Sequence, residues 1–581
     1  MFKDYYKKEL QQLNEIGKEF SKENPVLASY LSETSSDPDV ERLLQGVAFL
    51  TANINQKLDD EFPEIIHSLM QIIDPQYLRP IPAVTTIAFT PKSNLTEPIV
   101  IPAGTYIDSE TVEGTQCRFQ TCNNVEISPI ALTETSCLNL KEHGQETEEV
   151  EVKLNFELKA TTLENWDQQQ IDLHLTGEYS NACDIYFLLR HHLKKIVISS
   201  VDGNKLKELD ADKLVPKGFS DEESLEPYPK NLFPTFRILQ EYFLFPEKFL
   251  YLQLKLDEWI DRGTDDRFYV SFICTLPPFS FPKISNTSFE MFAAPAINLF
   301  QHESEPVQMD QYENEIRVVP SECHDGNIEV YSVDEVSGFM RGGSGKRVYN
   351  SLDEFKIRTN NNPNYQLVYR PSIRPQQTDL FIAVAYSPED YLTEQEIVSM
   401  QLSCTNGALP DELQSGDISK PTSNTPELVT FRNLKAPTKS YNAQLNEAVL
   451  WQLLSSLSVN SNALADLDSL KSLLKQNIRS GGRDKFQERA NDKRIDSIAG
   501  LNVVAEERLF GKSVYRGQNI HIKMRSDQFV GGGDMFLFGS ILEYFLGSYA
   551  SFNTYTALTI EDTIKWETIK WPARLGKRPL V

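Results

Sequence analysis

Apolar residues recur every three or four positions between residues 38 and 62. They are Val40, Leu43, Leu44, Val47, Leu50, Ile54, Leu58 and Phe62. This is the spacing of one apolar helix face, and the preceding Asp37-Pro38 pair is typical of a helix start. Pro63 is predicted to end this helix and to begin a second one, which the prolines from Pro75 onward terminate. The pattern therefore predicts a helical hairpin whose chemistry is packing.

The first 24 residues carry another apolar stripe, rich in aromatic side chains. Its members are Phe2, Tyr5, Tyr6, Leu10, Leu13, Ile16 and Phe20. A single amphipathic helix gains most of its stability from packing, so this stripe must be covered by another surface. Two surfaces fit the pattern: the neighbouring helix of the same chain, or a helical bundle formed with another subunit. Residues 1–78 are therefore predicted to form an N-terminal helical segment that joins such a bundle.

After Pro82 the pattern changes to short runs of β-rich sequence separated by turn residues, and several runs alternate apolar and polar residues as half-buried strands do. One short helix is predicted at 236–245, between two prolines. We expect a β-rich domain at 79–205 and a second β-rich region at 206–440. The second region contains one or two subdomains, with the Gly-rich turn at 342–345 as the dividing point.

Helical periodicity returns after residue 440, where leucines recur up to residue 474. A strand, a Gly-rich turn at 531–534, a helix at 535–550 and a further strand follow. This alternation predicts an α/β C-terminal domain at 441–581. The predicted fold class is thus α+β: an N-terminal helical segment, β-rich middle domains and an α/β C-terminal domain.

Composition and charge narrow the classes of function. The 581 residues carry a net charge of −26, so phosphate is repelled over most of the surface and nucleic acid is not an expected partner. Seven cysteines without a Cys-x-x-Cys pair indicate a reducing compartment. The charged N-terminus does not resemble an export signal, and no apolar run is long enough to span a membrane. We therefore expect a cytoplasmic protein.

No motif in the sequence supports a cofactor or a metal. Gly345-Lys346 resembles a phosphate-binding loop, but Met340 and Arg347 stand where that motif needs Gly and Ser or Thr. The adjacent His191-His192 pair lacks a second ligand pair at zinc spacing. A glycosidase-like pair of carboxylates has no local signature, so a β-rich carbohydrate-active or other hydrolytic enzyme stays open as the alternative function.

Two features near the C-terminus each allow two interpretations. The glycines at 531–533 precede a helix and could bind an anion, but Asp534 is placed to cap that helix itself, which is the favoured reading. The basic tail at 565–578 carries Trp566 and Trp571 and is either a contact with an acidic partner or a last strand with a solvated end. The candidate partner-interface residues are Phe2, Tyr5, Tyr6, Leu10, Leu13, Leu43, Val47, Leu50, Ile54, Trp566 and Trp571.

Sequence blocks along the whole chain resemble one family, the TssF (VasA or ImpG) baseplate subunits of the bacterial type VI secretion system. The similar blocks are DPDVERLLQGVAFLTANINQKLDDEFPEIIHSLMQIIDPQYLRPIP (37–82), RILQEYFLFPEKFLYLQL (237–254), AINLFQHESEPV (296–307), EVYSVDEV (329–336), LSCTNGALPDEL (402–413), LWQLLSSLSVN (450–460), FLFGSILEYFLGSYASFNTYTAL (536–558) and KWPARLGKRPL (570–580). One departure is Asn406-Gly407-Ala408, where the family resemblance implies an Arg- and Asp-bearing turn.

The resemblance implies a structural protein without enzymatic activity, related to the baseplate wedge proteins of contractile phage tails. It implies a wedge of two TssF copies with one TssG, placed around the VgrG spike hub with TssK and the sheath-initiating subunit TssE attached. The sheath is assembled on that platform for effector delivery. The implied location is the cytoplasm, in a baseplate docked at the inner membrane complex.

Overall fold

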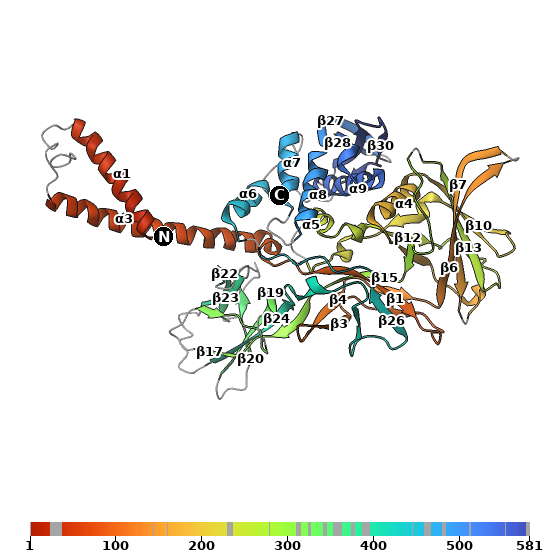
Figure 1. Cartoon of the computed structure of the whole chain (residues 1–581), viewed down its shortest axis with the longest axis horizontal. Coiled ribbons are helices and arrows are strands. Elements are labelled where there is room, and N and C mark those ends of the chain that lie inside the picture. The colour runs from red at the N-terminus through yellow and green to blue at the C-terminus, as the bar shows by residue number, and fades with distance from the viewer. Residues whose placement is uncertain are drawn as a thin grey trace.

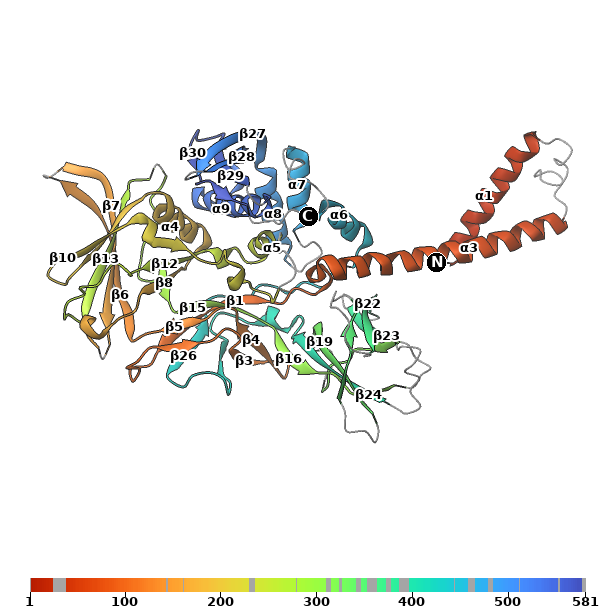
Figure 2. The same ribbon diagram turned by 180° about the vertical axis from the view of Figure 1, so that it is seen from behind.

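The fold of the chain is taken from a computed structural model. The residues that it describes are 2–23, 38–142, 145–159, 161–228, 236–277, 279–309, 315–322, 327–340, 346–352, 363–372, 378–385, 396–443, 445–457, 466–478, 484–510, 513–551 and 554–576. A helical arm projects from one side of a body made of β-sheets and a C-terminal α/β unit (Figure 1). The same arrangement is seen from behind in Figure 2.

The arm consists of α1 (Phe2–Glu23) and α3 (Pro38–Ile73). The prediction that Pro63 ends one helix and starts another is wrong, because α3 runs through Pro63 without a break. A proline removes a single backbone N–H from the helical ladder. Helical turns on both sides of Pro63 keep their hydrogen bonds, so the helix continues. The hairpin is formed instead by α1 and α3, and α1 crosses the first half of α3 (Figure 1).

The C-terminal end of α3 is anchored in the body. Gln366 on β22 (Asn364–Pro371) donates its side-chain amide to Ser68 Oγ at 2.7 Å, and the Tyr369 hydroxyl donates to Gln71 Oε1 at 3.1 Å. A small apolar core joins this end of α3 to η1 (Pro75–Leu78) and α6 (Glu447–Leu457). Its members are Ile66, Met70, Tyr77, Leu78, Leu450 and Leu453. The base of the arm is thus anchored in the body by both polar and apolar contacts.

A six-stranded antiparallel sheet lies at the centre of the body, in the order β25-β3-β4-β15-β1-β26. Its strands in chain order are β1 (Val84–Pro91), β3 (Tyr106–Val112), β4 (Thr115–Thr121), β15 (Ala293–Ile297), β25 (Ile418–Pro421) and β26 (Val429–Asn433). Half of these strands come from the predicted domain 79–205 and half from 206–440. The expected boundary at 205/206 therefore separates strands that hydrogen-bond to one another.

Two further sheets flank the central one. The five-stranded sheet has the order β10-β9-β13-β7-β6 and the four-stranded sheet the order β11-β12-β8-β14. Their strands are β6 (Ile130–Glu142), β7 (Gln145–Leu158), β8 (Gln170–Leu175), β9 (Leu193–Ser199), β10 (Lys205–Asp210), β11 (Leu214–Pro216), β12 (Tyr251–Lys255), β13 (Arg267–Thr275) and β14 (Phe289–Met291). A short ladder joins β2 (Ile99–Ile101) and β5 (Val125–Ile127). The helices here are α4 (Tyr179–His191) and α5 (Arg237–Leu244), and α5 confirms the helix predicted at 236–245.

The segment between residues 300 and 405 forms two more sheets with a core of their own. The strands are β16 (Phe300–Glu303), β17 (Val307–Met309), β18 (Glu315–Arg317), β19 (Glu329–Met340), β20 (Lys346–Val348), β21 (Asn350–Ser351), β22, β23 (Thr378–Ala385) and β24 (Glu396–Thr405). The Gly-rich turn at 342–345 lies outside the described residues. Two hydrogen bonds of 2.8 Å hold the turn at Asn406. The Asn298 side-chain amide donates to Asn406 Oδ1, and the Asn406 backbone N–H donates to Asn298 Oδ1.

The C-terminal unit is an α/β sheet in which β28 and β29 are parallel. Parallel neighbours need a crossover connection, and α9 provides it. The elements are α7 (Leu467–Gln476), α8 (Lys485–Asp496), β27 (Ile498–Phe510), β28 (Ser513–Met524), α9 (Gly532–Tyr549), β29 (Thr554–Asp562), β30 (Thr568–Lys570) and β31 (Arg574–Leu575). One continuous apolar core joins this unit to the flanking sheets.

The start of α9 is capped by a carboxylate from another helix. Gly533 donates its backbone N–H to Asp184 Oδ1 on α4 at 2.9 Å, and a Cβ at Gly533 would lie 2.3 Å from the Cys183 carbonyl. Asp534 does not cap the first turn as predicted. Its carboxylate is buried and accepts from Arg494, from the Tyr179 hydroxyl and, at 3.4 Å, from the backbone N–H of Val530, which precedes the helix. The helix N-terminus is thus filled from within the chain, which leaves no space for an external anion.

A buried histidine makes stability depend on pH. His174 on β8 stacks on Tyr251 at 4.2 Å, and burial lowers the pKa of its imidazole to about 3. The unfolded chain takes up this proton near pH 6.5, so the stabilisation is complete above that pH and is lost as pH falls toward 3. We expect the unfolding free energy of the wild type to fall more steeply between about pH 6 and pH 4 than that of the His174→Phe variant. The difference is up to about 1.4 kcal/mol per pH unit, and urea unfolding measures it. Equal slopes would contradict this assignment.

Candidate protein–protein interfaces

The apolar stripe of α3 faces solvent along the projecting arm. Leu43, Val47 and Leu50 are 69%, 46% and 63% exposed, and their spacing of four and three residues places them on one side of the helix. Ala48 and Ala52, in the part of α3 that α1 crosses, are fully buried. Small side chains let two helices approach closely, so α1 packs on the alanine side. The larger apolar side chains are left uncovered by the chain itself.

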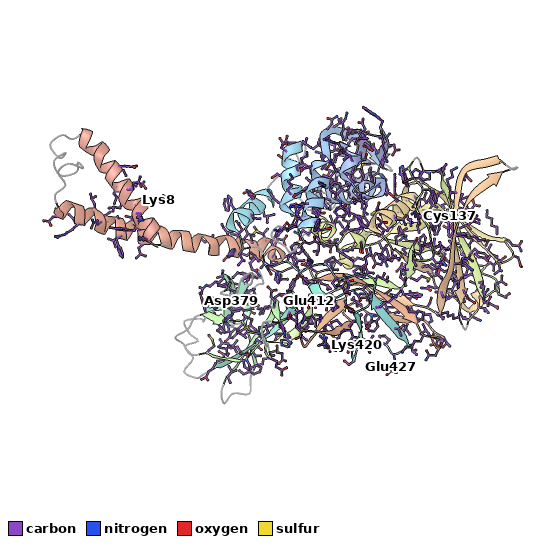
Figure 3. All side chains as sticks on the ribbon, viewed as in Figure 1. Lys8, Cys137, Asp379, Glu412, Lys420 and Glu427 are labelled. Carbon is purple, nitrogen blue, oxygen red and sulfur yellow. The ribbon has the colours of Figure 1, made fainter. Side chains whose placement is uncertain are left out.

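On α1, the described stripe residues Tyr6, Leu10 and Leu13 are half-buried. The contact between α1 and α3 covers part of this stripe, and the other part stays accessible. The side chains of Phe2, Tyr5 and Ile54 lie outside the described residues. Lys8, labelled in Figure 3, lies on the same helix in the projecting arm.

The exposed apolar surface of α3 is larger than the candidate set predicted from the sequence. Phe49, Ile65, Leu69 and Ile73 are also exposed, and the last three lie on the part of α3 nearer the body. The sequence could have indicated these additional residues, because α3 carries large apolar residues at more positions than fit on one helix face. A surface of this kind on a projecting element is typical of an interaction site.

The two tail tryptophans have different surroundings. Trp566, between β29 and β30, is 77% exposed. Trp571 is half-buried, stacks on Phe536 at 5.4 Å and donates its indole N–H to Ser540 Oγ at 3.2 Å. Arg574 of the basic tail forms a bidentate pair with Glu543 at 2.7 and 2.9 Å. The β29–β30 connection lies in the C-terminal unit, away from α1 and the arm (Figures 1 and 2).

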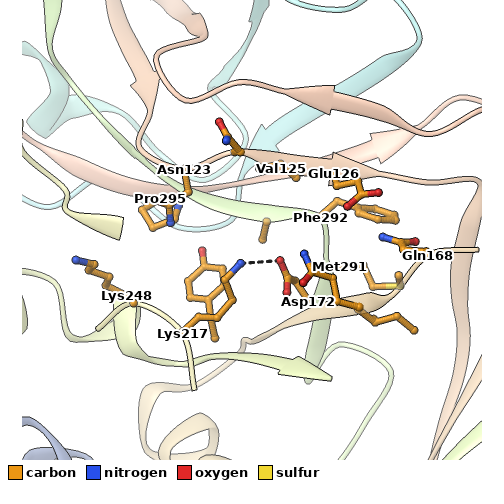
Figure 4. Close-up of a pocket in the computed structure, with 16 residues that line it drawn as sticks. Asn123, Val125, Glu126, Gln168, Asp172, Lys217, Lys248, Met291, Phe292 and Pro295 are labelled. Atoms are coloured by element: carbon orange, nitrogen blue, oxygen red, sulfur yellow. Dashed lines mark hydrogen bonds and ion pairs between the residues drawn. The ribbon is translucent and has the colours of Figure 1, made fainter. Parts of the chain in front are cut away.

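Figure 4 shows a cavity lined by residues from the central and flanking sheets. Its charged lining includes Asp172, whose Oδ2 accepts from Lys217 Nζ at 2.7 Å, and the buried Lys248. The cavity volume is about 30 Å³. Sites for small organic ligands occupy about 300–1,000 Å³, so this cavity has room for water only.

An open groove of about 550 Å³ runs between α4, α9 and the tail. Three carboxylates line it, and each has a partner. Glu543 pairs with Arg574, and Asp221 pairs with Arg237 at 3.0 Å. Glu223 accepts from the Gly218 backbone N–H at 2.8 Å and from Ser220. A hydrolase uses an acid and a base that reach the substrate, and each of these three carboxylates is engaged with a group of the chain itself.

The histidine pair also has a structural explanation. His191 stacks on Phe187 at 5.4 Å, and the His192 ring packs edge-on against Phe187 and Phe279. Burial lowers the pKa of His192 to about 4. In the described part of the chain there is no group of three or more His, Cys, Asp or Glu side chains that could hold a metal ion. None of the described helices is long and apolar enough to cross a membrane.

The model of one protein family, "Type VI secretion system, TssF", matches residues 1–578 of the chain. The chain belongs to the TssF family. This TssF-family chain is 26% identical to the "Type VI secretion system component TssF1" of Pseudomonas aeruginosa, over 99% of both chains. The match extends from the helical arm to the basic tail and confirms the resemblance seen in the sequence.

Two solved structures share the fold of this TssF-family chain. One is a cryo-electron microscopy structure of a type VI secretion system TssK–TssF–TssG baseplate subcomplex. Its similar chain is 24% identical with a TM-score of 0.79, and the match covers 93% of this chain and 99% of the other. The second is a baseplate complex from the type VI secretion system, at 22% identity and a TM-score of 0.61, covering 99% and 100% of the two chains. The α+β fold of this chain is therefore shared with one chain in each of these structures.

Proposed function

We propose that the chain is a structural wedge subunit that joins TssG through its helical arm. As a member of the TssF family, the chain is a component of the type VI secretion system baseplate. The observation that carries the proposal is the uncovered apolar stripe of Leu43, Val47 and Leu50 on α3. Burying the exposed parts of these side chains against a partner helix contributes about 1–2 kcal/mol each.

The partners follow from the family and from the assemblies that share the fold. TssG and TssK are named with TssF in the related subcomplex, and both are proposed as direct neighbours of this chain. A second copy of the chain, TssE, the VgrG spike hub and, indirectly, the sheath complete the proposed assembly. Its proposed location is the cytoplasmic side of the inner membrane complex, where the baseplate docks.

We also propose that the chain has no enzymatic activity. The cavity in Figure 4 has room for water only, and the carboxylates of the larger groove are each held by a partner. Neither site offers a free acid and base. We therefore infer that the ion pairs and hydrogen bonds of these carboxylates stabilise the fold.

The test is co-expression of the chain with TssG, followed by co-purification and size-exclusion chromatography. We expect a stable complex for the wild type and loss of that complex when Tyr5, Tyr6 and Leu10 are replaced by aspartate. Lys7, Gln11 and Gln12 are exposed on the same helix, and their replacement by aspartate is the matched control that retains assembly.

The outcomes separate the two surfaces of α1. Loss of assembly with unchanged stability of the isolated chain assigns the aromatic stripe to the partner. Unchanged assembly with lowered stability assigns it to the contact with α3. A well-folded wild-type chain that does not bind TssG contradicts the proposed function itself.

A further inference from the structure

The loop between β12 and β13 presents an apolar side chain to solvent. Ile260 is 88% exposed, and no other large apolar side chain among the described residues is exposed to a greater fraction. Its neighbour Trp259 is buried. Scattered exposed apolar residues are ordinary, so the surroundings of Ile260 decide whether it has a role.

Contacts on the C-terminal side of Ile260 hold the loop against the body. The Arg262 guanidinium lies 4.9 Å from the Trp166 ring and 5.3 Å from the Trp259 ring. It also donates to the Trp166 carbonyl at 2.7 Å and to the Trp259 carbonyl at 3.0 Å. Cation–π contacts strengthen when they are desolvated, and Arg262 is buried.

The backbone adds two further ties. Leu163 donates its N–H to the Asp265 carbonyl at 2.9 Å, and Leu158 donates to the Asp266 carbonyl at 2.7 Å. Phe268 of β13 completes an aromatic cluster with Trp166 and Trp259, at ring distances of 5.6 and 5.1 Å. A preorganised loop binds a partner without first losing conformational entropy.

Exposed acidic side chains accompany Ile260. Lys213 pairs with two acids of the loop, Asp257 at 3.0 Å and Glu258 at 2.7 Å. Five other exposed acids in the loop and in the adjoining 163–169 segment have no cation within ion-pair distance among the described residues. They are Glu164, Asp167, Asp261, Asp265 and Asp266. Glu164, Asp167, Ile260 and Asp261 line one open depression.

We propose that residues 257–266 form a docking surface for a neighbouring baseplate subunit with a basic surface around an apolar socket. Ile260 is the apolar anchor of this contact, and the unpaired acids face lysines or arginines of the partner. The same acids repel nucleic acid and anionic membrane, which leaves a basic protein surface as the complementary occupant. Strands β12 and β13 lie across the body from the arm (Figures 1 and 2). This surface is thus separate from the proposed TssG contact. The inference rests on the proposed function in one respect, namely that the partner is another subunit of the baseplate.

The experiment measures the accessibility of position 260 by maleimide labelling of an Ile260→Cys variant. Labelling rates are compared between the purified chain and the complete baseplate isolated through a tag on the chain. We expect at least tenfold slower labelling in the baseplate. A Val530→Cys variant, at an exposed position elsewhere on the body, labels at the same rate in both states, and the wild-type chain supplies the background from native cysteines.

Charge reversal tests the acidic part of the surface. Combining Asp261→Lys and Asp265→Lys with Ile260→Cys is expected to return the labelling rate in the baseplate to that of the free chain. The same charge change at the exposed Asp202 and Asp210 leaves the protection unchanged. Equal labelling of Ile260→Cys in the free and assembled states overturns the docking surface, while failure of the chain to bind TssG overturns the wedge proposal instead.

Discussion

Replacing Leu43 and Leu50 by aspartate is expected to weaken binding of TssG at least a hundredfold. Both leucines are uncovered on the projecting arm. Each Leu→Asp change removes about 1–2 kcal/mol of apolar burial at an interface and adds a carboxylate whose desolvation opposes binding. A hundredfold loss corresponds to about 2.8 kcal/mol. The affinity is measured by titrating the purified chain with TssG.

The isolated variant is expected to remain as stable as the wild type. Substitution of exposed residues changes the free energy of unfolding by less than about 0.5 kcal/mol, which urea unfolding of the chain alone measures. Gln45→Asp with Asn53→Asp is the matched control, because both residues are exposed on the same helix. Unchanged affinity of the leucine variant would remove the α3 stripe from the wedge interface, and a large loss of stability would place it in the internal packing of the arm.

The Arg494→Met variant is expected to lose about 3–5 kcal/mol of unfolding free energy. Arg494 Nε and Nη2 donate to the Asp534 carboxylate at 3.2 and 3.1 Å, and both side chains are buried. The ion pair joins α8 to the start of α9, and the Tyr179 hydroxyl donates to the same carboxylate from α4 at 2.9 Å. Removing the guanidinium leaves a buried carboxylate without a counter-ion, which is far more costly than losing both charges.

Urea unfolding followed by tryptophan fluorescence measures this loss. Arg516→Met is the control, because Arg516 pairs with Glu507 on the surface and an exposed pair contributes about 0–1 kcal/mol. The double variant Arg494→Met, Asp534→Asn is expected to recover part of the loss because it removes the unpaired charge. A single variant as stable as the Arg516 control would show that the buried pair does not hold α8 and α9 together.

Local sequence patterns predicted helices whose ends and apolar faces depend on residues close together in the chain. The stripe of Phe2 to Phe20 predicted a first helix over the first 24 residues, and α1 spans Phe2–Glu23. The helix predicted at 236–245 is α5, because the prolines at both ends restrict the backbone there. The family resemblance needed no structure either, since its blocks are collinear over the whole chain.

Long-range contacts decided what local sequence patterns could not indicate. Asp184 on α4 caps α9, so Asp534 at the start of α9 pairs with Arg494 instead of capping its own helix. Trp571 stacks on Phe536 of α9. The sequence of the tail alone cannot indicate this contact. The central sheet pairs β1 with β15 and β26, strands so distant in sequence that no local pattern could indicate their register.

The sequence by itself determined the helical arm, the β-rich middle, the α/β end and the family, because hydrophobic periodicity and collinear blocks are properties of the chain alone. The tertiary structure decided which apolar surfaces are covered. Periodicity marks a helix face as apolar without saying what packs on it. The contact of α1 with α3 leaves Leu43, Val47 and Leu50 exposed while Ala48 and Ala52 are buried, and Arg262 ties the loop that exposes Ile260 to Trp166 and Trp259.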